Sequence, residues 1–222
     1  METTRIAELL QPFLNDPEQS KSAVLSADQL KYISTYIDML RRWNTRINLT
    51  AIRPPEEIVT RHFGESLFAA RHLFPAEQCR RERPRSCTVI DIGSGAGFPG
   101  LPIGIWAPEI DLTLIESNQK KATFLREVTR SLTLMNINVF PGRAADYSNP
   151  PADVVTLRAV EHFETTLPIA ASLVAPGGRL ALLISNPQLA HAKDLTPAFA
   201  WTPPFRIPLS SNRILAIAFR KS

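Results

Sequence analysis

A glycine-rich segment behind a short run of apolar, β-branched residues constrains the fold of this chain more than any other feature. The run Val89–Ile92 contains Asp91, and the loop after it has glycines at alternate positions, Gly93, Gly95 and Gly97. Glycine permits the positive φ angles and the close ligand approach that such a loop requires. A β-branched run before this loop is typical of a buried strand that leads into a helix. The segment therefore predicts a ligand-binding strand–loop–helix unit of an α/β protein.

The next apolar run also ends in an acid, which indicates the class of ligand. Leu112–Ile115 is followed directly by Glu116, sixteen residues after Gly100. In α/β nucleotide sites, a carboxylate at the tip of the second strand holds the ribose hydroxyls. From Gly95 onwards the loop also fits the dinucleotide pattern G-x-G-x-x-G. A nucleotide-like ligand is predicted, and a nicotinamide oxidoreductase remains one alternative.

Asp91 distinguishes between a dinucleotide, which carries a negatively charged pyrophosphate, and a nucleoside ligand that carries positive charge. Its carboxylate stands two residues before Gly93 and would repel a pyrophosphate at the helix N-terminus, which otherwise attracts anions. S-adenosylmethionine instead carries a sulfonium and an ammonium, which a nearby carboxylate attracts. We therefore expect S-adenosylmethionine as the cofactor, with its ribose on Glu116 and with Phe98 covering the loop. The binding residues expected from this argument include Asp91, Gly95, Gly97 and Glu116.

The order of predicted elements indicates one α/β domain with a helical extension. The chain has 222 residues, which is long for one domain and short for two. Residues 1–75 are expected to form helices, 76–86 an Arg/Pro linker and 87–222 the ligand-binding domain. Strands and helices alternate from residue 87 on, which implies a mainly parallel sheet with right-handed crossovers. We expect seven strands, the last two as an antiparallel hairpin, at 88–93, 111–116, 137–141, 153–158, 178–184, 205–210 and 213–220.

Three helices are expected between these strands and three before them. The pattern places helices at 99–107, 118–133 and 162–174, the second capped by Ser117 or Asn118. In the extension, Ser26 and Gln29 form a capping box, and Pro54-Pro55 opens a further helix.

Composition and charge favour a cytoplasmic protein with an anionic partner. Hydrophobic residues make up 44% of the chain, and no apolar run approaches the roughly 18 residues of a spanning helix. The first ten residues lack a signal-peptide pattern. The net charge is +4, and residues 40–85 contain ten arginines, five glutamates and no lysine. Because the planar guanidinium suits phosphates and stacks on bases, we expect this stretch to contact RNA.

Two residues in this stretch have a structural interpretation that we prefer to a functional one. Trp43 could stack on a splayed nucleotide, but we expect it to pack within the helices. His62 is expected to be a structural histidine. Arg158, which ends a predicted strand at the ligand edge of the sheet, is expected to be functional.

Several further strings resemble those of one family. Trp43–Thr50 contains the pattern W-N-x-x-x-N-L-T, and the glycine loop continues into Phe98-Pro99-Gly100. Together with Arg61–Leu67, Lys120–Leu125, Asn136–Val139 and Arg158–Val160, they make the whole chain resemble the bacterial glucose-inhibited division protein B family. This is the family of small-subunit ribosomal RNA guanine-N7 methyltransferases.

The resemblance implies a class I, Rossmann-like, S-adenosylmethionine-dependent methyltransferase with an N-terminal helical cap. It implies further cofactor contacts at Gly93, Phe98, the backbone of Ala144 and Ala145, and Arg158. Ribosomal RNA of the small subunit would be the partner, with naked RNA and an assembled particle both open as acceptors. The RNA contacts that we expect are Arg41, Arg42, Arg46, Asn48 and Arg158.

The chain departs from the family pattern at three places. Glu65 stands where the family usually has Asp, and Ala145 stands where it usually has Glu. At the second position either the backbone N–H alone reads the adenine or Asp146 takes over that role. Ser185 follows the fifth strand where the family has Lys-Gly, which removes a cation that could contact the substrate.

The residues around the loop favour a ring nitrogen of a base as the acceptor of the methyl group. Guanine N7 presents an in-plane lone pair and needs no proton removed, so positioning alone can carry the reaction. Accordingly we assign no catalytic base or nucleophile and expect no metal. Methylation of an exocyclic amine predicts an Asn/Asp-Pro-Pro-aromatic string after the fourth strand, where Arg158-Ala159-Val160 stands instead. Carbon-5 methylation needs a late cysteine, and both cysteines precede residue 88.

Other functional classes stay open. The fold alone does not fix the acceptor, so a methyltransferase acting on another RNA position or on a small molecule is the main alternative. A non-catalytic RNA-binding protein is a further one. We expect the protein to be a monomer.

Overall fold

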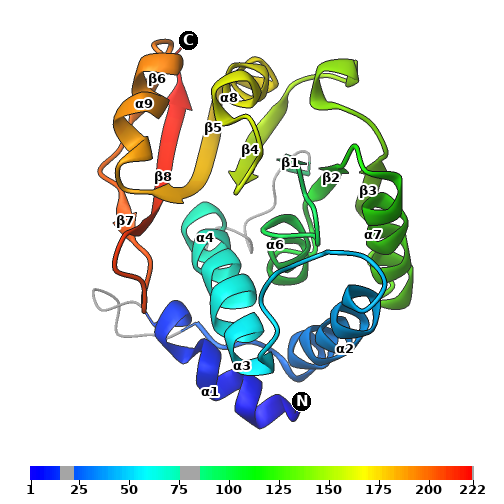
Figure 1. Cartoon of the computed structure of the whole chain (residues 1–222). Coiled ribbons are helices and arrows are strands. Elements are labelled where there is room, and N and C mark those ends of the chain that lie inside the picture. The colour runs from blue at the N-terminus through cyan, green and yellow to red at the C-terminus, as the bar shows by residue number, and fades with distance from the viewer. Residues whose placement is uncertain (16–22, 76–85, 222) are drawn as a thin grey trace.

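Parallel strands form the centre of the structure, a computed structural model that describes residues 1–15, 23–75 and 86–221. Within these residues one sheet has the strand order β3-β2-β1-β4-β5-β8-β6, and β7 pairs with β8 outside this path (Figure 1). The pairs among β1 to β5 are parallel, whereas β8 runs antiparallel to β5, β6 and β7. The strands are β1 (Thr88–Ile92), β2 (Asp111–Ile115), β3 (Ile137–Phe140), β4 (Ala152–Arg158), β5 (Val174–Ser185), β6 (Phe199–Trp201), β7 (Phe205–Arg206) and β8 (Arg213–Arg220).

The mainly parallel sheet with an antiparallel last hairpin is confirmed, but two details of the prediction differ. The described residues contain eight strands rather than seven, because β6 has three residues and is too short to show the alternation of a strand. The predicted strand 205–210 is reduced to β7, two residues long. Ile207 still donates to the carbonyl of Arg213, and Pro208, which has no N–H, then ends the pairing.

The strand order reverses beside β1, and this reversal locates the ligand edge. β1 pairs with β2 on one side and with β4 on the other. In open α/β sheets, ligands bind outside the carboxyl ends of the strands at such a switch point. Gly93 follows β1, Glu116 follows β2 and Arg158 ends β4. The fold therefore brings three of the predicted site residues to one edge.

The described residues of the α/β part form four helices, three of which begin and end close to the predicted positions. They are α6 (Gly100–Trp106), α7 (Gln119–Ser131), α8 (Phe163–Ser172) and α9 (Gln188–Leu195), with a 3-10 turn η2 (Ala144–Asp146) after β3. Asn118 caps α7, because its side chain accepts from the N–H groups of Lys120 and Lys121. The helix α9 was not predicted from the sequence.

The N-terminal residues form the expected helical cap. Its elements are α1 (Thr3–Leu14), α2 (Ala27–Asn44), α3 (Pro55–Glu57), the π-helical η1 (Ile58–Gly64) and α4 (Glu65–Leu73). Ser26 and Gln29 make the predicted capping box of α2. The helix opened by Pro54-Pro55 continues through η1 into α4 without a break, and short π-helical stretches are frequent at functional sites.

The cap and the sheet share one hydrophobic core. Tyr36 and Phe63 from the cap belong to the same buried cluster as Leu112 of β2 and Phe124 of α7. Figure 1 shows α1, α2 and α4 in the lower half of the view and α8 and α9 in the upper half. Apart from Ser86, the predicted linker 76–86 lies outside the described residues.

Candidate functional site

The glycine loop after β1 turns back onto the end of β2. Gly93, Gly95 and Gly97 all have positive φ angles, as predicted from their spacing. The N–H groups of Gly93 and Ser94 both donate to the carbonyl of Ile115, at 2.9 and 3.1 Å. The loop is thereby anchored to the neighbouring strand, with Glu116 next to it.

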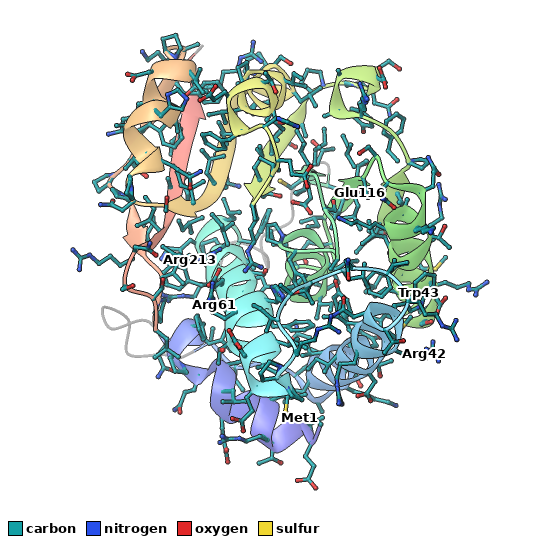
Figure 2. All side chains as sticks on the ribbon, viewed as in Figure 1. Met1, Arg42, Trp43, Arg61, Glu116 and Arg213 are labelled. Carbon is teal, nitrogen blue, oxygen red and sulfur yellow. The ribbon has the colours of Figure 1, made fainter. Side chains whose placement is uncertain are left out.

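Glu116 connects the loop to the start of α7. Its Oε2 accepts a hydrogen bond from the N–H of Gly95 at 2.8 Å, and its Oε1 accepts from the N–H of Asn118 at 2.7 Å. The side chain is buried and lies at the upper end of α7 in Figure 2. The two features from which a nucleotide site was predicted are therefore in direct contact. Each carboxylate oxygen keeps a second lone pair for a further donor.

Asp91 lies beneath the loop in the interior. It is fully buried; Oδ1 accepts from the hydroxyl of Thr156 at 2.7 Å, and Oδ2 accepts from the N–H of Gly100 at 3.2 Å. Burial raises the pKa of the Asp91 carboxyl to about 6, although these hydrogen bonds and Arg158 lower it. The carboxylate thus ties β1 to β4 and to the first residue of α6.

The side chain of Phe98, expected to cover the loop, points into the helical cap. Its ring stacks on Tyr36 with centroids 5.4 Å apart and on His62 with centroids 4.7 Å apart. The Tyr36 hydroxyl also donates to the carbonyl of Ala96. Tyr36 is therefore a loop-supporting residue that the sequence reasoning missed, and its place on the apolar face of α2 was the available signal.

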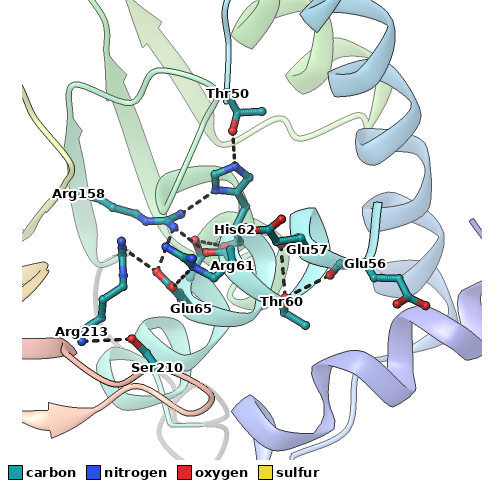
Figure 3. A network of polar contacts seen from close by, with 11 residues as sticks. Thr50, Glu56, Glu57, Thr60, Arg61, His62, Glu65, Arg158, Ser210 and Arg213 are labelled. Atoms are coloured by element: carbon teal, nitrogen blue, oxygen red, sulfur yellow. Dashed lines mark hydrogen bonds and ion pairs between the residues drawn. The ribbon is translucent and has the colours of Figure 1, made fainter. Parts of the chain in front are cut away.

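Three arginines converge on one buried carboxylate beside the loop (Figure 3). Glu65 Oε2 accepts from Arg158 Nη2 at 3.0 Å and from Arg213 Nη2 at 2.8 Å. Its Oε1 accepts from Arg61 Nε at 3.1 Å. Glu65 and Arg158 are buried, whereas Arg213 and Arg61 are partly exposed. We call these four residues the arginine cluster.

His62 joins this cluster as a neutral base. Its Nδ1 lies 3.3 Å from Arg158 Nη1, and its Nε2 lies 2.7 Å from the hydroxyl of Thr50. Burial, followed by the charges of Arg158, Arg61 and Arg213, lowers the pKa of His62 to about 3. Both ring nitrogens of His62 are engaged and its ring is stacked on Phe98, and these contacts agree with the structural role that we expect for it.

Asn44 fixes the segment that carries Thr50. Its Oδ1 accepts from the N–H groups of Leu49 and Thr50, and its Nδ2 donates to the carbonyl of Thr50. The conformation of the segment 45–50 is therefore set by the side chain that ends α2. In the W-N-x-x-x-N-L-T pattern, the first asparagine organises the loop and the second, Asn48, is exposed.

The residues expected to contact RNA lie at the end of α2. Arg41, Arg42 and Arg46 are exposed. Trp43 is partly buried, packs against Phe124 with centroids 5.7 Å apart and donates from Nε1 to a carboxylate of α7. Trp43 thus packs within the helices, as expected.

Two other positions depart from the family pattern, Ala145 and Ser185, and at each of them another polar group lies close to the substituted residue. Ala145 and Asp146 are exposed on η2, and the first N–H groups of such a turn have no partner inside it. Arg213 pairs directly with Ser185 across β5 and β8. A cation from the neighbouring strand therefore stands at the strand end where the lysine is missing.

No helix within the described ranges is long and apolar enough to cross a membrane, and within them no group of three or more potential metal ligands occurs.

Comparison with known structures supports the fold. The chain is similar to the magnesium protoporphyrin IX methyltransferase of Synechocystis PCC 6803, solved with bound S-adenosylmethionine, with a TM-score of 0.64 and 15% identity. That match covers 90% of this chain and 100% of the other. A ribosomal protein L11 methylase from Lactobacillus delbrueckii subsp. bulgaricus gives a TM-score of 0.57 at 14% identity, over 72% of this chain and 80% of that one. The architecture is that of class I methyltransferases.

Comparison of sequences is more specific. The family model described as rRNA small subunit methyltransferase G matches residues 29–200. The ribosomal RNA small subunit methyltransferase G of Xanthomonas euvesicatoria pv. vesicatoria (strain 85-10) is 35% identical over 205 residues, 90% of this chain and 89% of that protein. Its counterpart from Streptococcus pyogenes serotype M12 (strain MGAS2096) is 32% identical over 209 residues, 89% and 85% of the two chains. On this similarity along most of its length, the chain belongs to the rRNA small subunit methyltransferase G family.

Proposed function

We propose that this protein transfers a methyl group from S-adenosylmethionine to N7 of a guanine in small-subunit ribosomal RNA. The single observation that carries the proposal is the contact between the Glu116 carboxylate and the glycine loop, in a chain of the rRNA small subunit methyltransferase G family. The contact supports a nucleoside site at the switch point of the sheet. The family supports the reaction and the RNA acceptor.

In this proposal the cofactor lies over the loop with its ribose on Glu116. Each Glu116 oxygen accepts one backbone N–H, so its second lone pair can accept a ribose hydroxyl. Gly93, Gly95 and Gly97 let the backbone approach the ligand. Phe98 contributes through its backbone, because its ring is stacked between two others. Asp91 contributes a negative charge below the loop that favours the sulfonium and ammonium.

The backbone of η2 is the proposed adenine contact. Ala144 and Ala145 open this turn beyond the end of β3, at the edge that also carries Glu116. Their N–H groups are available to an adenine nitrogen, and the exposed carboxylate of Asp146 can accept from the exocyclic amine.

The arginine cluster is the proposed acceptor side of the site. Three guanidiniums face one carboxylate there, and the Nε–H of Arg213 has no partner among the described residues. Such a surplus of positive charge and donors favours an anionic substrate such as RNA. His62 is uncharged and already engaged, which supports an acceptor that needs no general base, as N7 does.

The proposed RNA surface extends from this cluster to the exposed end of α2. Arg41, Arg42, Arg46 and Asn48 are the contacts there, and Arg158 is the contact at the cluster. The enzyme would act in the cytoplasm, where ribosomal RNA is made into subunits, and as a monomer.

The test is methylation of small-subunit RNA by the purified protein, followed by digestion and identification of the methylated nucleoside. We expect 7-methylguanosine at one position. The Gly95→Val variant, which should not bind the cofactor, is the control for contaminating activity. A product methylated on N1 or on the exocyclic amine would contradict the N7 assignment, and methylation of small molecules alone would support the alternative acceptor class.

A further inference from the structure

A separate cavity lies between the end of α2 and α7. Its volume is about 280 Å³, and it is lined by Arg42, Trp43, Arg46 and Glu127. Trp43 and Arg42 lie beside α7 in Figure 2, below Glu116 and away from Arg61 and Arg213 of the arginine cluster. None of these four residues contacts the glycine loop through a hydrogen bond or an ion pair described above. We call this space the α2–α7 cavity.

One oxygen of Glu127 holds the wall of the cavity in place. Oε1 accepts from Arg42 Nη2 at 2.9 Å and from Trp43 Nε1 at 3.1 Å. Both donors use the same oxygen, so Oε2 accepts no hydrogen bond within the part of the chain that the structure describes. The carboxylate therefore has a fixed orientation and an acceptor still available to a ligand.

The lining of the cavity carries one more positive charge than negative charges. Arg46 is exposed, and its side chain forms no hydrogen bond or ion pair with the residues described here. Arg42 is balanced by Glu127, but Arg46 is not, which leaves the lining with one net positive charge. Arg41 is exposed nearby in the sequence but does not line the cavity. The surplus favours an anionic ligand.

The size and the chemistry of the cavity fit one nucleotide. Pockets for small ligands begin at about 300 Å³, so this one is too small for a whole cofactor. Trp43 packs against Phe124, but it is only partly buried and also lines the cavity. An indole and guanidinium planes are groups on which unpaired bases stack. The available Glu127 Oε2 can accept from an exocyclic amine, which adenine, cytosine and guanine have and uracil lacks.

We propose that the α2–α7 cavity takes one unpaired, amino-bearing base of the substrate RNA, with Arg46 on its phosphate, outside the site of methyl transfer. The inference rests on the proposed function, because it assumes that the substrate is RNA. Asn44 connects the cavity to the acceptor side of the site. Its side chain fixes the segment from Arg46 to Thr50, and Thr50 contacts His62 of the acceptor side. A base held in the cavity would set the register of the RNA against the target guanine.

The first experiment compares two arginine variants in RNA binding. Arg46→Gln should weaken the binding of a small-subunit RNA fragment about tenfold and lower the slope of log affinity against log salt by about 1. Arg130→Gln is the matched control, because Arg130 is also exposed, at the end of α7, and does not line the cavity. Affinity for S-adenosylmethionine should stay unchanged in both variants. Equal weakening by the two variants would show general electrostatics and overturn the inference.

The second experiment tests the base directly with short single-stranded oligonucleotides. The wild type should bind oligo(C) and oligo(A) more tightly than oligo(U), and Glu127→Gln, which replaces one acceptor by a donor, should reduce that preference. Arg46→Gln should weaken all three equally. An identical preference in the wild type and in Glu127→Gln would overturn the base assignment. Since these assays do not measure methylation, their failure would leave the proposed function standing.

Discussion

Arg158 Nη1 lies 3.3 Å from Nδ1 of His62, and this contact decides which ring nitrogen carries the proton. A guanidinium can only donate, so Nδ1 accepts and the proton is on Nε2, where it is donated to the Thr50 hydroxyl at 2.7 Å. Two residues 96 positions apart thereby fix a histidine in one tautomer beside the loop. Burial, and after it the neighbouring arginines, lower the pKa of His62 and keep this ring uncharged.

This tautomer leads to a prediction about pH. The pKa of His62 is about 3, and N7 requires no proton removal, so single-turnover rates with saturating cofactor should be flat from about pH 7 to 9. His62→Ala should lower the rate through loss of the stacking on Phe98 without altering the shape of the profile. An acidic limb above pH 6 that disappears in His62→Ala would instead reveal a general base.

A second prediction concerns Asp91→Asn, which removes the charge of the side chain and keeps its shape. The pKa of Asp91 in the fold is about 6 against 3.8 in the unfolded chain, so the folded state holds the proton more tightly. The stability contributed by that proton is complete below about pH 4 and is lost as the pH rises through 6, roughly 3 kcal/mol in all. Asp91→Asn should remove this loss, so its free energy of unfolding should rise relative to wild type between about pH 4 and 8.

The same variant should bind S-adenosylmethionine more weakly at pH 8, because the charge that favours the sulfonium is gone. Chemical denaturation and calorimetric titration measure the two effects. A variant that is less stable than wild type at pH 8 would refute the burial argument, and unchanged affinity would remove Asp91 from the cofactor site.

Two glycine substitutions in the loop should have different effects, one on cofactor binding and the other on the stability of the fold. A Cβ at Gly95 would meet only the Gly93 carbonyl oxygen, at 3.8 Å, so Gly95→Val should fold while losing cofactor binding through its φ of +57° and the ligand space it fills. A Cβ at Gly97 would overlap the Tyr36 hydroxyl and the side chain of Leu101. Gly97→Ala should therefore destabilise the protein itself, which thermal unfolding would detect. Wild-type affinity in Gly95→Val would contradict the assignment of the loop.

Glu65 should be a strong determinant of stability. Glu65→Gln leaves the guanidiniums of Arg61, Arg158 and Arg213 without their buried carboxylate, and breaking such a pair costs about 3–5 kcal/mol. Glu8→Gln is a control, because the exposed pair of Arg5 and Glu8 should contribute less than about 1 kcal/mol. Equal free energies of unfolding in the two variants would show that Glu65 is not the centre of the cluster.

Local patterns predicted the elements well where a residue's role depends on its neighbours in sequence. Ser26 with Gln29, Asn118 before α7 and the glycines after β1 each fulfil their predicted local role. The short strands β6 and β7 were missed or overextended, because two or three residues carry no period and prolines decide where pairing stops.

The sequence by itself determined the parallel sheet, the loop, the acid within the first strand and the acid that follows the second strand. These follow from hydrophobic period, glycine and chain order, which act over a few residues. Only the tertiary structure decided that Phe98 faces Tyr36 and His62, that Asp91 is buried under Gly100, and that Arg213 stands beside Ser185. Those contacts join residues distant in the chain, and burial shifts the pKa of Asp91 and of His62. No local pattern in the sequence contains this information.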